Sequence, residues 1–324
     1  MTHAPMPAPP PPGARLSLAY ARLVQKPTLR LMRNHALLRW LFSVQCRLAA
    51  APPRDLGVRA GSFGHLGGRR VPAHWIRPAG VARDAPVLFH VHGGGFVLGG
   101  PDTHRGMVAR IAARAGMRAV IPAYRLAPEH PYPAAPDDVE VAWLGLTRRV
   151  PPSRIALSGD SAGGTLALSL IHRLNRRGAP LPRAMVLMSP LADLTLTSDA
   201  MLADPEADPL IPAAWAERVI DAYVRGADRT DGDVSPLFGD LGRAPPTLIQ
   251  CSADELLRDD ALRLERRLSG AGAEVRLSQF HGVPHVWQMQ AGRSAPADLA
   301  VEELGAFLSE RMGTDRRPRP ERTA

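Results

Sequence analysis

Hydrophobic positions change their spacing near residue 50. Before that point they recur every three or four residues, as in amphipathic helices, first over 14–26 and again over 28–49. Proline at position 27 interrupts the pattern, so two helices are predicted. Beyond residue 50, short apolar runs alternate with helical stretches, which is typical of parallel strands joined by helical crossovers. The pattern predicts an α/β protein with a mostly parallel central sheet flanked by helices.

The alternation can be assigned element by element. Buried strands are predicted at 86–92, 119–123, 155–158, 184–188, 247–251 and 275–280. Helices are predicted at 105–115, 136–148, 163–176, 215–224, 259–268 and 297–311. The glycine pairs in 61–76 indicate an antiparallel hairpin that precedes the parallel strands.

One long insertion, 191–235, separates two core strands, and an insertion of this size is typical of a lid or cap. We therefore expect a core made of 51–190 and 236–312, covered by a helical cap made of 14–50 and 191–235. The apolar faces of the N-terminal helices are expected to pack on the rest of the protein. Contact of these basic helices with a membrane surface is the less favoured alternative.

The two ends of the chain differ from the body in composition. The proline-rich stretch 1–13 is predicted to be disordered, and 313–324 to be a flexible basic tail.

The start lacks the basic and apolar regions of a signal peptide, and no transmembrane span is visible, so a cytoplasmic location is expected. Two cysteines in 324 residues exclude a disulfide-framework protein.

Charge is concentrated at the ends as well. The chain has a net charge of +9, of which +7 falls in residues 1–50, where there is no Asp or Glu. The tail from residue 313 adds +2, so the body between them is neutral. A neutral body argues against a nucleic-acid partner. Arginine outnumbers lysine 39 to 1, which indicates a coding bias rather than phosphate recognition.

A nucleophile is indicated by Gly159-Asp160-Ser161-Ala162-Gly163, which fits the G-x-S-x-G pattern of a nucleophile elbow. Small residues around the serine allow a sharp turn from strand to helix that exposes its hydroxyl. The start of the following helix supplies N–H groups to a developing negative charge. A predicted strand precedes Ser161 and a predicted helix follows it, as the motif requires.

A second glycine-rich motif ends the predicted strand 86–92. It reads His92-Gly93-Gly94-Gly95 and is typical of an oxyanion hole whose backbone N–H groups converge on one point. The predicted donors are the N–H groups of Gly93, Gly94 and Ala162.

A serine triad also needs a carboxylate and a histidine after the nucleophile. His172 falls inside the helix after Ser161, whereas His281 and His285 both follow the last predicted strand. Asp254 and Glu255 both follow the preceding strand, where the acid is expected. The residues by themselves leave open which of the two histidines and which of the two carboxylates belongs to the triad.

Taken together, five motifs resemble the hormone-sensitive-lipase-like branch of the α/β-hydrolases, the bacterial family IV esterases, over about residues 55–312. They are HGGG at 92–95, YRLAPE at 124–129, GDSAGG at 159–164, DPL at 208–210 and SPLF at 235–238. The resemblance implies an α/β-hydrolase fold with a helical cap. It also implies that Glu255, in register with Leu257-Arg258-Asp259, is the triad acid and that His285 is the base.

The function implied is hydrolysis of short- to medium-chain acyl esters by a serine carboxylesterase that forms an acyl-enzyme. The expected partner is a small-molecule ester, and no cofactor or metal is expected. Asp199, Asp204 and Asp208 lack the spacing of metal ligands. An amide or formamide hydrolase with the same site, or a non-catalytic binding protein on the same fold, are the alternatives.

Overall fold

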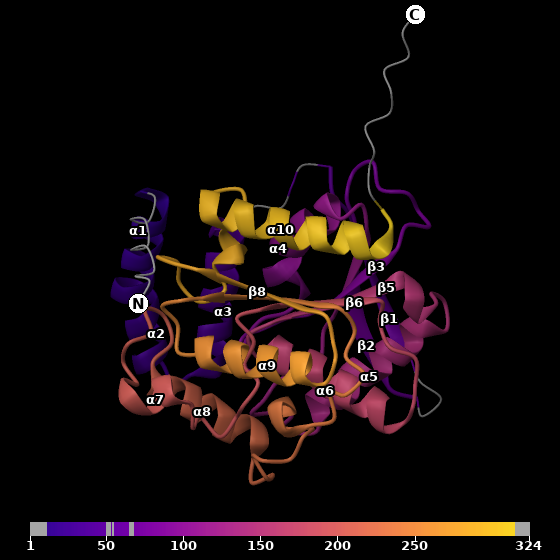
Figure 1. The fold of residues 1–324 in the computed structure, drawn as a ribbon. Coiled ribbons are helices and arrows are strands. Elements are labelled where there is room, and N and C mark those ends of the chain that lie inside the picture. Colours follow the sequence, from indigo (N-terminus) through magenta and orange to yellow (C-terminus); the bar gives the residue numbers. More distant parts are fainter. Residues whose placement is uncertain (1–11, 50–52, 54, 65–67, 315–324) are drawn as a thin grey trace, which may run out of the picture.

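The computed structural model describes residues 12–49, 53, 55–64 and 68–314. Within them, eight strands form one sheet in the order β1-β2-β4-β3-β5-β6-β7-β8 (Figure 1). The pairs β1/β2 and β2/β4 are antiparallel and the remaining pairs are parallel. The strands are β1 (Gly57–Gly64), β2 (Arg70–Arg77), β3 (Val87–Val91), β4 (Arg118–Pro122), β5 (Ile155–Asp160), β6 (Ala184–Met188), β7 (Thr247–Ser252) and β8 (Val275–Phe280).

The predicted α/β sheet is thus confirmed, and the ends of its six predicted parallel strands are found within two residues of the expected positions. The predicted hairpin is the pair β1/β2. The apolar runs predict the strand positions well because β3, β5, β6 and β7 are buried along their whole length. Strands buried on both faces carry continuous apolar runs, which are easy to locate in a sequence.

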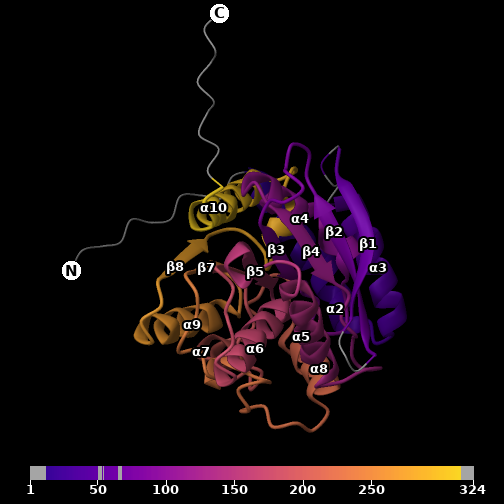
Figure 2. The same ribbon diagram turned by 90° about the vertical axis from the view of Figure 1, so that its right-hand side faces the viewer.

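Helices cover both faces of the sheet (Figures 1 and 2). On one face lie α4 (Pro101–Arg114) and α10 (Ala295–Met312), on the other α5 (Ala134–Thr147), α6 (Ala162–Arg176) and α9 (Arg258–Gly270). The alternation of side chains along each strand divides the core accordingly. In β3, Leu88 packs in the cluster with α4 and α10, whereas Phe89 packs in the cluster with α5 and α6.

Shorter elements lie at the two ends of the strands. The insertion between β6 and β7 contains α7 (Asp199–Ala203) and α8 (Ala213–Val224). Single turns occur at η2 (Pro152–Arg154), η3 (Pro236–Phe238) and η4 (Trp287–Gln290). Of the predicted disordered start and basic tail, only residues 12–13 and 313–314 are described; the rest lies outside the described residues. No helix among those described is both long and apolar enough to span a bilayer.

The N-terminal segment is helical, but its helices are divided differently from the prediction. A first helical run comprises α1 (Pro12–Tyr20), the π-helical turn η1 (Ala21–Gln25) and α2 (Lys26–Leu31), and α3 (His35–Ala49) follows it. The expected break at Pro27 was wrong, and the break lies at 32–34 instead. Pro27 occupies the first turn of α2, where its missing N–H is not needed. The wider turn η1 precedes it, with Lys26 N–H donating to the carbonyl of Ala21.

Three basic side chains attach this segment to the rest of the molecule. Arg39 of α3 donates to the carbonyls of Val97 and Ala127 at 2.7 and 2.8 Å and to the Glu129 carboxylate at 2.7 and 2.8 Å. The Arg39 guanidinium lowers the pKa of Glu129 to about 2. Lys26 Nζ donates to the carbonyl of Asp208 at 3.0 Å. From the other side, Arg218 of α8 donates to the carbonyl of Leu29 at 2.8 Å.

Backbones meet without side chains between them where β3, β5 and α6 converge. A Cβ atom at Gly163 would lie 2.1 Å from the carbonyl oxygen of Val91, and one at Gly159 would lie 2.4 Å from that of Gly163. These distances are far below van der Waals contact, so neither glycine can carry a side chain without moving the backbone. The approach of α6 to β3 fixes where the turn between β5 and α6 projects.

We predict that Gly163→Ala lowers the free energy of unfolding by about 2 kcal/mol, because the added methyl group forces α6 away from β3. Urea denaturation at neutral pH measures the change. Gly270→Ala is the control, since no heavy atom lies within 4 Å of its Cβ position. The control should stay within about 0.5 kcal/mol of the parent protein. Equal stabilities of the two variants would contradict the proposed contact.

Candidate active site

Ser161 lies in the sharp turn between β5 and α6. Its backbone angles, φ 51° and ψ −124°, place a residue with a side chain in a region that non-glycine residues rarely adopt. This strain is maintained by the tight packing at Gly159 and Gly163, and strained residues cluster at functional sites. The N–H of Ala162, the first residue of α6, has no acceptor within the helix. The turn therefore has the geometry of a nucleophile elbow.

His285 and Glu255 meet from the loops that follow β8 and β7. Nδ1 of His285 lies 2.6 Å from Oε2 of Glu255, and both side chains are buried. The other carboxylate oxygen accepts the Ser252 N–H at 2.9 Å, which fixes the orientation of the carboxylate. A carboxylate can only accept, so Nδ1 carries the proton and Nε2 of the neutral ring has a free lone pair.

The other candidates considered in the sequence have different partners. Asp254 accepts the Gly282 N–H at 2.7 Å and does not pair with a histidine. His172 lies in α6 and accepts the Asp240 N–H at 2.7 Å. His281 is exposed on the loop after β8. Of the four combinations left open by the sequence, the structure pairs Glu255 with His285.

The charges around His285 favour its protonated form. Burial by itself would lower the pKa of the imidazole, but the Glu255 carboxylate raises it more, with help from Asp208 and Asp160. The net pKa of His285 is raised above its usual value. An imidazole that readily takes up a proton is suited to act as a general base and then as a general acid.

Ser161 and His285 line the same pocket, which has a volume of about 340 Å³. Its other walls are mostly apolar and come from several parts of the chain, including Pro284, Val286 and Met289 from the segment after β8. The N-terminal helices, the glycine loop after β3 and the insertion contribute Tyr20, Val24, Leu29, Leu38, Phe42, Gly94, Gly95, Leu98, Leu210, Ile211 and Trp215. A serine and an oriented histidine are thus brought together in a small hydrophobic cavity.

The glycine loop departs from the prediction at Gly93. Its N–H donates to Oδ1 of Asp160 at 3.0 Å, so it is engaged inside the protein and cannot serve a bound oxyanion. Gly94 and Gly95 line the pocket, and their N–H groups have no acceptor among the described residues. Both have positive φ angles, +118° and +58°, which suit glycine and turn the loop sharply. In the described loop, the N–H of Gly93 is therefore paired, whereas those of Gly94 and Gly95 are unpaired.

Asp160 is a central residue of the site that the sequence analysis treated only as the variable position of the elbow. Nε2 of His90 and Nε2 of His104 lie 3.2 and 3.3 Å from its two oxygens. Burial by itself would raise the pKa of Asp160, but the two histidines lower it well below its usual range. The charged carboxylate therefore joins the elbow, the glycine loop and α4. The sequence signal for it is a histidine at position 90 inside an otherwise apolar strand, since a buried histidine needs a polar partner.

Asp208 is a second buried carboxylate that the sequence analysis did not connect with the site. Its Oδ1 accepts the N–H groups of Leu210 and Ile211 at 2.7 and 2.8 Å, and its Oδ2 accepts that of Leu256 at 3.0 Å. Burial raises the pKa of Asp208. These bonds connect the insertion to the loop that carries Glu255. The described residues contain no group of three His, Cys, Asp or Glu side chains arranged to bind a metal ion.

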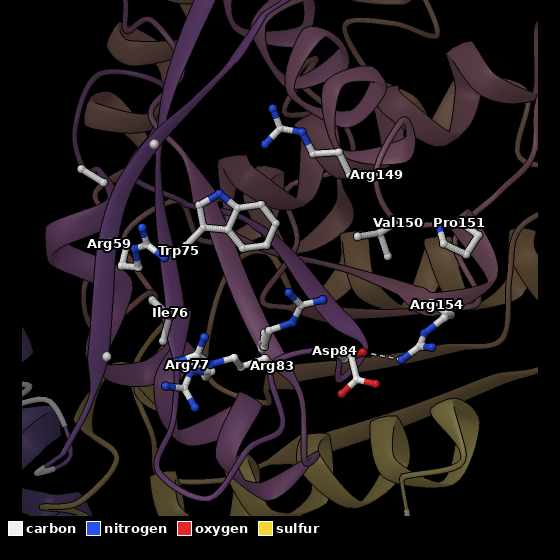
Figure 3. A pocket seen from close by; sticks show the side chains of 14 residues that line it. Arg59, Trp75, Ile76, Arg77, Arg83, Asp84, Arg149, Val150, Pro151 and Arg154 are labelled. Atoms are coloured by element: carbon white, nitrogen blue, oxygen red, sulfur yellow. Dashed lines mark hydrogen bonds between the residues drawn. The ribbon is translucent and has the colours of Figure 1, made fainter.

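A larger pocket of about 870 Å³ lies at the opposite ends of the parallel strands, roughly 20 Å from Ser161 along β5 (Figure 3). Arginines surround it and Arg154 donates to the carbonyl of Asp84 across it. No serine, cysteine or histidine lines this pocket, and its carboxylate, Asp84, has no histidine among the lining residues to act with. The chemistry is therefore assigned to the smaller pocket at Ser161.

Comparison with known proteins identifies the protein family to which the chain belongs. A family model described as the alpha/beta hydrolase fold matches residues 88–289, so the chain belongs to the α/β-hydrolase family. Among solved structures it resembles an esterase from the bacterial hormone-sensitive lipase family, with a TM-score of 0.85, 33% identity and coverage of 94% of this chain and 100% of the other. A structure of EstE5 is also similar, with a TM-score of 0.86 and 29% identity. The match covers 94% of this chain and 99% of EstE5. The predicted hormone-sensitive-lipase-like branch is confirmed.

Curated relatives agree with this assignment. An acetyl-hydrolase of Streptomyces hygroscopicus is 35% identical over 260 residues, which cover 80% of this chain and 86% of the relative. An esterase of Acinetobacter venetianus is 37% identical over 245 residues, which cover 72% of this chain and 80% of the relative. The predicted enzyme class, a carboxylic ester hydrolase, is confirmed at this level.

We predict that Asp160→Asn lowers the free energy of unfolding by about 3 kcal/mol at pH 7, because a buried charge is lost that accepts the Gly93 N–H and lies beside His90 and His104. The pKa of Asp160 in the folded protein lies below the usual value of about 3.9 for an aspartate, so its contribution to stability is complete above about pH 4. The difference between the parent protein and the variant should shrink as the pH falls further.

Denaturation in urea across this pH range is the measurement. Asp84→Asn, which removes an exposed carboxylate, is the control. A loss of less than about 1 kcal/mol at pH 7 for Asp160→Asn would show that the carboxylate does not hold the two loops together.

Proposed function

We propose that the protein is a serine carboxylesterase that uses Ser161 as nucleophile, His285 as general base and Glu255 as the acid that orients His285. The observation that carries the proposal is the 2.6 Å hydrogen bond between His285 and Glu255 at the pocket that also contains Ser161. The strained backbone of Ser161 and the raised pKa of His285 support the same roles.

The proposed reaction is a two-step acyl transfer. Nε2 of His285 takes the hydroxyl proton as Ser161 Oγ attacks the ester carbonyl, and a tetrahedral oxyanion forms. The N–H groups of Gly94, Gly95 and Ala162 stabilise it, and losing one such donor typically costs about 3–4 kcal/mol. The C–O bond to the alcohol then breaks, and His285 returns the proton to the leaving oxygen. Water attacks the acyl-enzyme by the same route, which releases the acid and regenerates Ser161.

The size of the pocket supports short- to medium-chain acyl groups as substrates. A volume of about 340 Å³ lies at the lower end for small-molecule sites. A Cβ atom at Gly95 would lie 2.8 Å from Cη2 of Trp215, so the indole stands directly against the oxyanion loop. Trp215 limits the space beside the reacting carbonyl. A relative named acetyl-hydrolase supports the same substrate range.

Residues 14–50 and 191–235 are proposed to form the cap over this pocket. Tyr20, Val24 and Phe42 from the first segment and Trp215 from the second line it together. Lys26 and Arg218 connect the two segments through backbone carbonyls at Asp208 and Leu29. The cap thus supplies the apolar walls, whereas the core supplies the reacting groups.

Hydrolysis of p-nitrophenyl esters of rising acyl length tests the function. We expect the highest kcat/KM for acetate to hexanoate, and a loss of at least about 10⁴-fold in Ser161→Ala, which keeps the fold but has no nucleophile. p-Nitroanilides of the same acids test the amide alternative. If the folded protein turns over no ester, or if Ser161→Ala retains its activity, the proposed function is wrong.

The acid is tested by comparing Glu255→Gln with Asp254→Asn. Glu255→Gln should lower kcat by about 10³- to 10⁴-fold, because the amide no longer fixes the tautomer or stabilises the imidazolium. Glu255 raises the pKa of His285, so its loss should move the acid limb of the kcat/KM profile to lower pH by on the order of one unit. Asp254→Asn is the matched control, with activity and pH profile unchanged. The opposite order of effects would make Asp254 the acid.

A further inference from the structure

Exposed apolar side chains are concentrated on the N-terminal helices. The described chain has eleven large hydrophobic residues with exposed side chains, and seven of them lie between residues 16 and 40. Leu16, Leu23 and Leu31 are each at least 75% exposed and Trp40 is 60% exposed. Such a concentration is unusual on a monomer, where exposed apolar residues are normally scattered. We refer to the exposed Leu16, Tyr20, Leu23, Val24, Leu31, Leu37 and Trp40 as the apolar face.

This finding overturns the expectation that the apolar residues of 14–26 pack on the body. Leu16, Tyr20, Leu23 and Val24 all lie on the outside. Ala21, between them, is the fully buried residue of this run. In this run the large apolar side chains are exposed, whereas farther along the segment Leu38 is buried and Leu29, Met32 and Phe42 pack against the core. In Figure 1, α1 and α2 form the margin of the molecule on the side opposite β1.

The N-terminal segment itself carries only basic charged side chains. Residues 1–50 contain no Asp or Glu. Lys26, Arg30 and Arg39 have carboxylate partners in Glu206 and Glu129. Exposed arginines at 22, 33 and 47 add positive charge to the same helices without a carboxylate within 4 Å in the described part of the chain. An apolar surface with a basic border, a tryptophan and a tyrosine matches the composition of helices that lie at an anionic lipid surface.

The apolar face is continuous with the entrance of the active-site pocket. Tyr20 and Val24 are 45% and 46% exposed, yet both also line the pocket that contains Ser161. Contact of this face with a bilayer would therefore bring the pocket entrance to the lipid. An apolar ester could then enter the pocket without crossing water.

We propose that α1, η1, α2 and α3 bind an anionic lipid surface through the apolar face, and that the enzyme takes lipid-dissolved ester substrates from that surface. The second half of the proposal rests on the esterase function proposed above. A second copy of the chain is a poorer occupant, because the exposed Arg22, Arg33 and Arg47, which have no carboxylate partner among the described residues, would repel those of the other copy.

Vesicle co-sedimentation tests the binding independently of catalysis. The probe is full-length Ser161→Ala with vesicles of phosphatidylcholine alone or of equimolar phosphatidylcholine and phosphatidylglycerol. We expect binding to the anionic vesicles that weakens in high salt, because surface charges are screened. Leu16→Ser/Leu23→Ser/Leu31→Ser should reduce this binding by at least about tenfold, because the apolar area that inserts is lost.

The controls separate this proposal from a folding defect and from the proposed function. None of Leu16, Leu23 and Leu31 lines the pocket, so the triple variant on the Ser161 background should hydrolyse water-soluble p-nitrophenyl acetate within about twofold of the parent rate. Val58→Ser/Phe238→Ser removes exposed apolar side chains elsewhere and should bind vesicles normally. Loss of acetate hydrolysis in the parent protein would refute the esterase and leave vesicle binding as a separate result.

Two outcomes would overturn the proposal. One is the absence of parent-protein binding to either kind of vesicle. The other is a dimer, measured by light scattering after gel filtration, that the triple leucine variant converts to a monomer, since the apolar face would then be an interface between copies.

Discussion

The Asp160 carboxylate connects parts of the site that are distant in sequence. It is the last residue of β5, directly before the nucleophile, and it accepts the Gly93 N–H from the loop after β3. His90 in β3 and His104 in α4 approach its two oxygens. A buried carboxylate is costly unless such partners surround it, so the Gly93 N–H, the two histidines and the charge stabilise one another. The distance between the proposed nucleophile and the proposed oxyanion donors is set by this cluster.

This arrangement explains why one of three adjacent glycines differs in role from the other two. Gly93 must be glycine because a Cβ atom there would lie 2.2 Å from Oδ2 of Asp160. Its N–H is then committed to that carboxylate, and the chain turns at Gly94 and Gly95 toward the pocket. A motif shows that N–H groups are available in a loop, but it does not show their direction. The sequence therefore located the glycine loop, but it did not show that the N–H of Gly93 is bonded to Asp160.

The parts of the fold that could be predicted are those in which local pattern and burial agree. β6 and β8 have the expected ends, because a strand's apolar run or its alternation is bounded by polar residues. The pairing of Glu255 with His285 could be inferred only from the register of a family motif, since spacing alone left Asp254 equally possible. Partners such as Asp160 with His104, or Asp208 with the Leu256 N–H, depend on tertiary contacts between separate segments. No periodicity in the chain encodes them.

In the N-terminal helices the sequence pattern predicted the helices themselves but not the contacts of their apolar side chains. An amphipathic pattern establishes that a helix has an apolar face, but not what that face contacts. Here Ala21 and the basic groups of Lys26 and Arg39 fix the helices to the protein, while Leu23 and Leu31 point outward. The same segment supplies Tyr20 and Val24 to the active-site pocket. Any surface that binds the outer side of these helices therefore also acts on the entrance through which the substrate must pass.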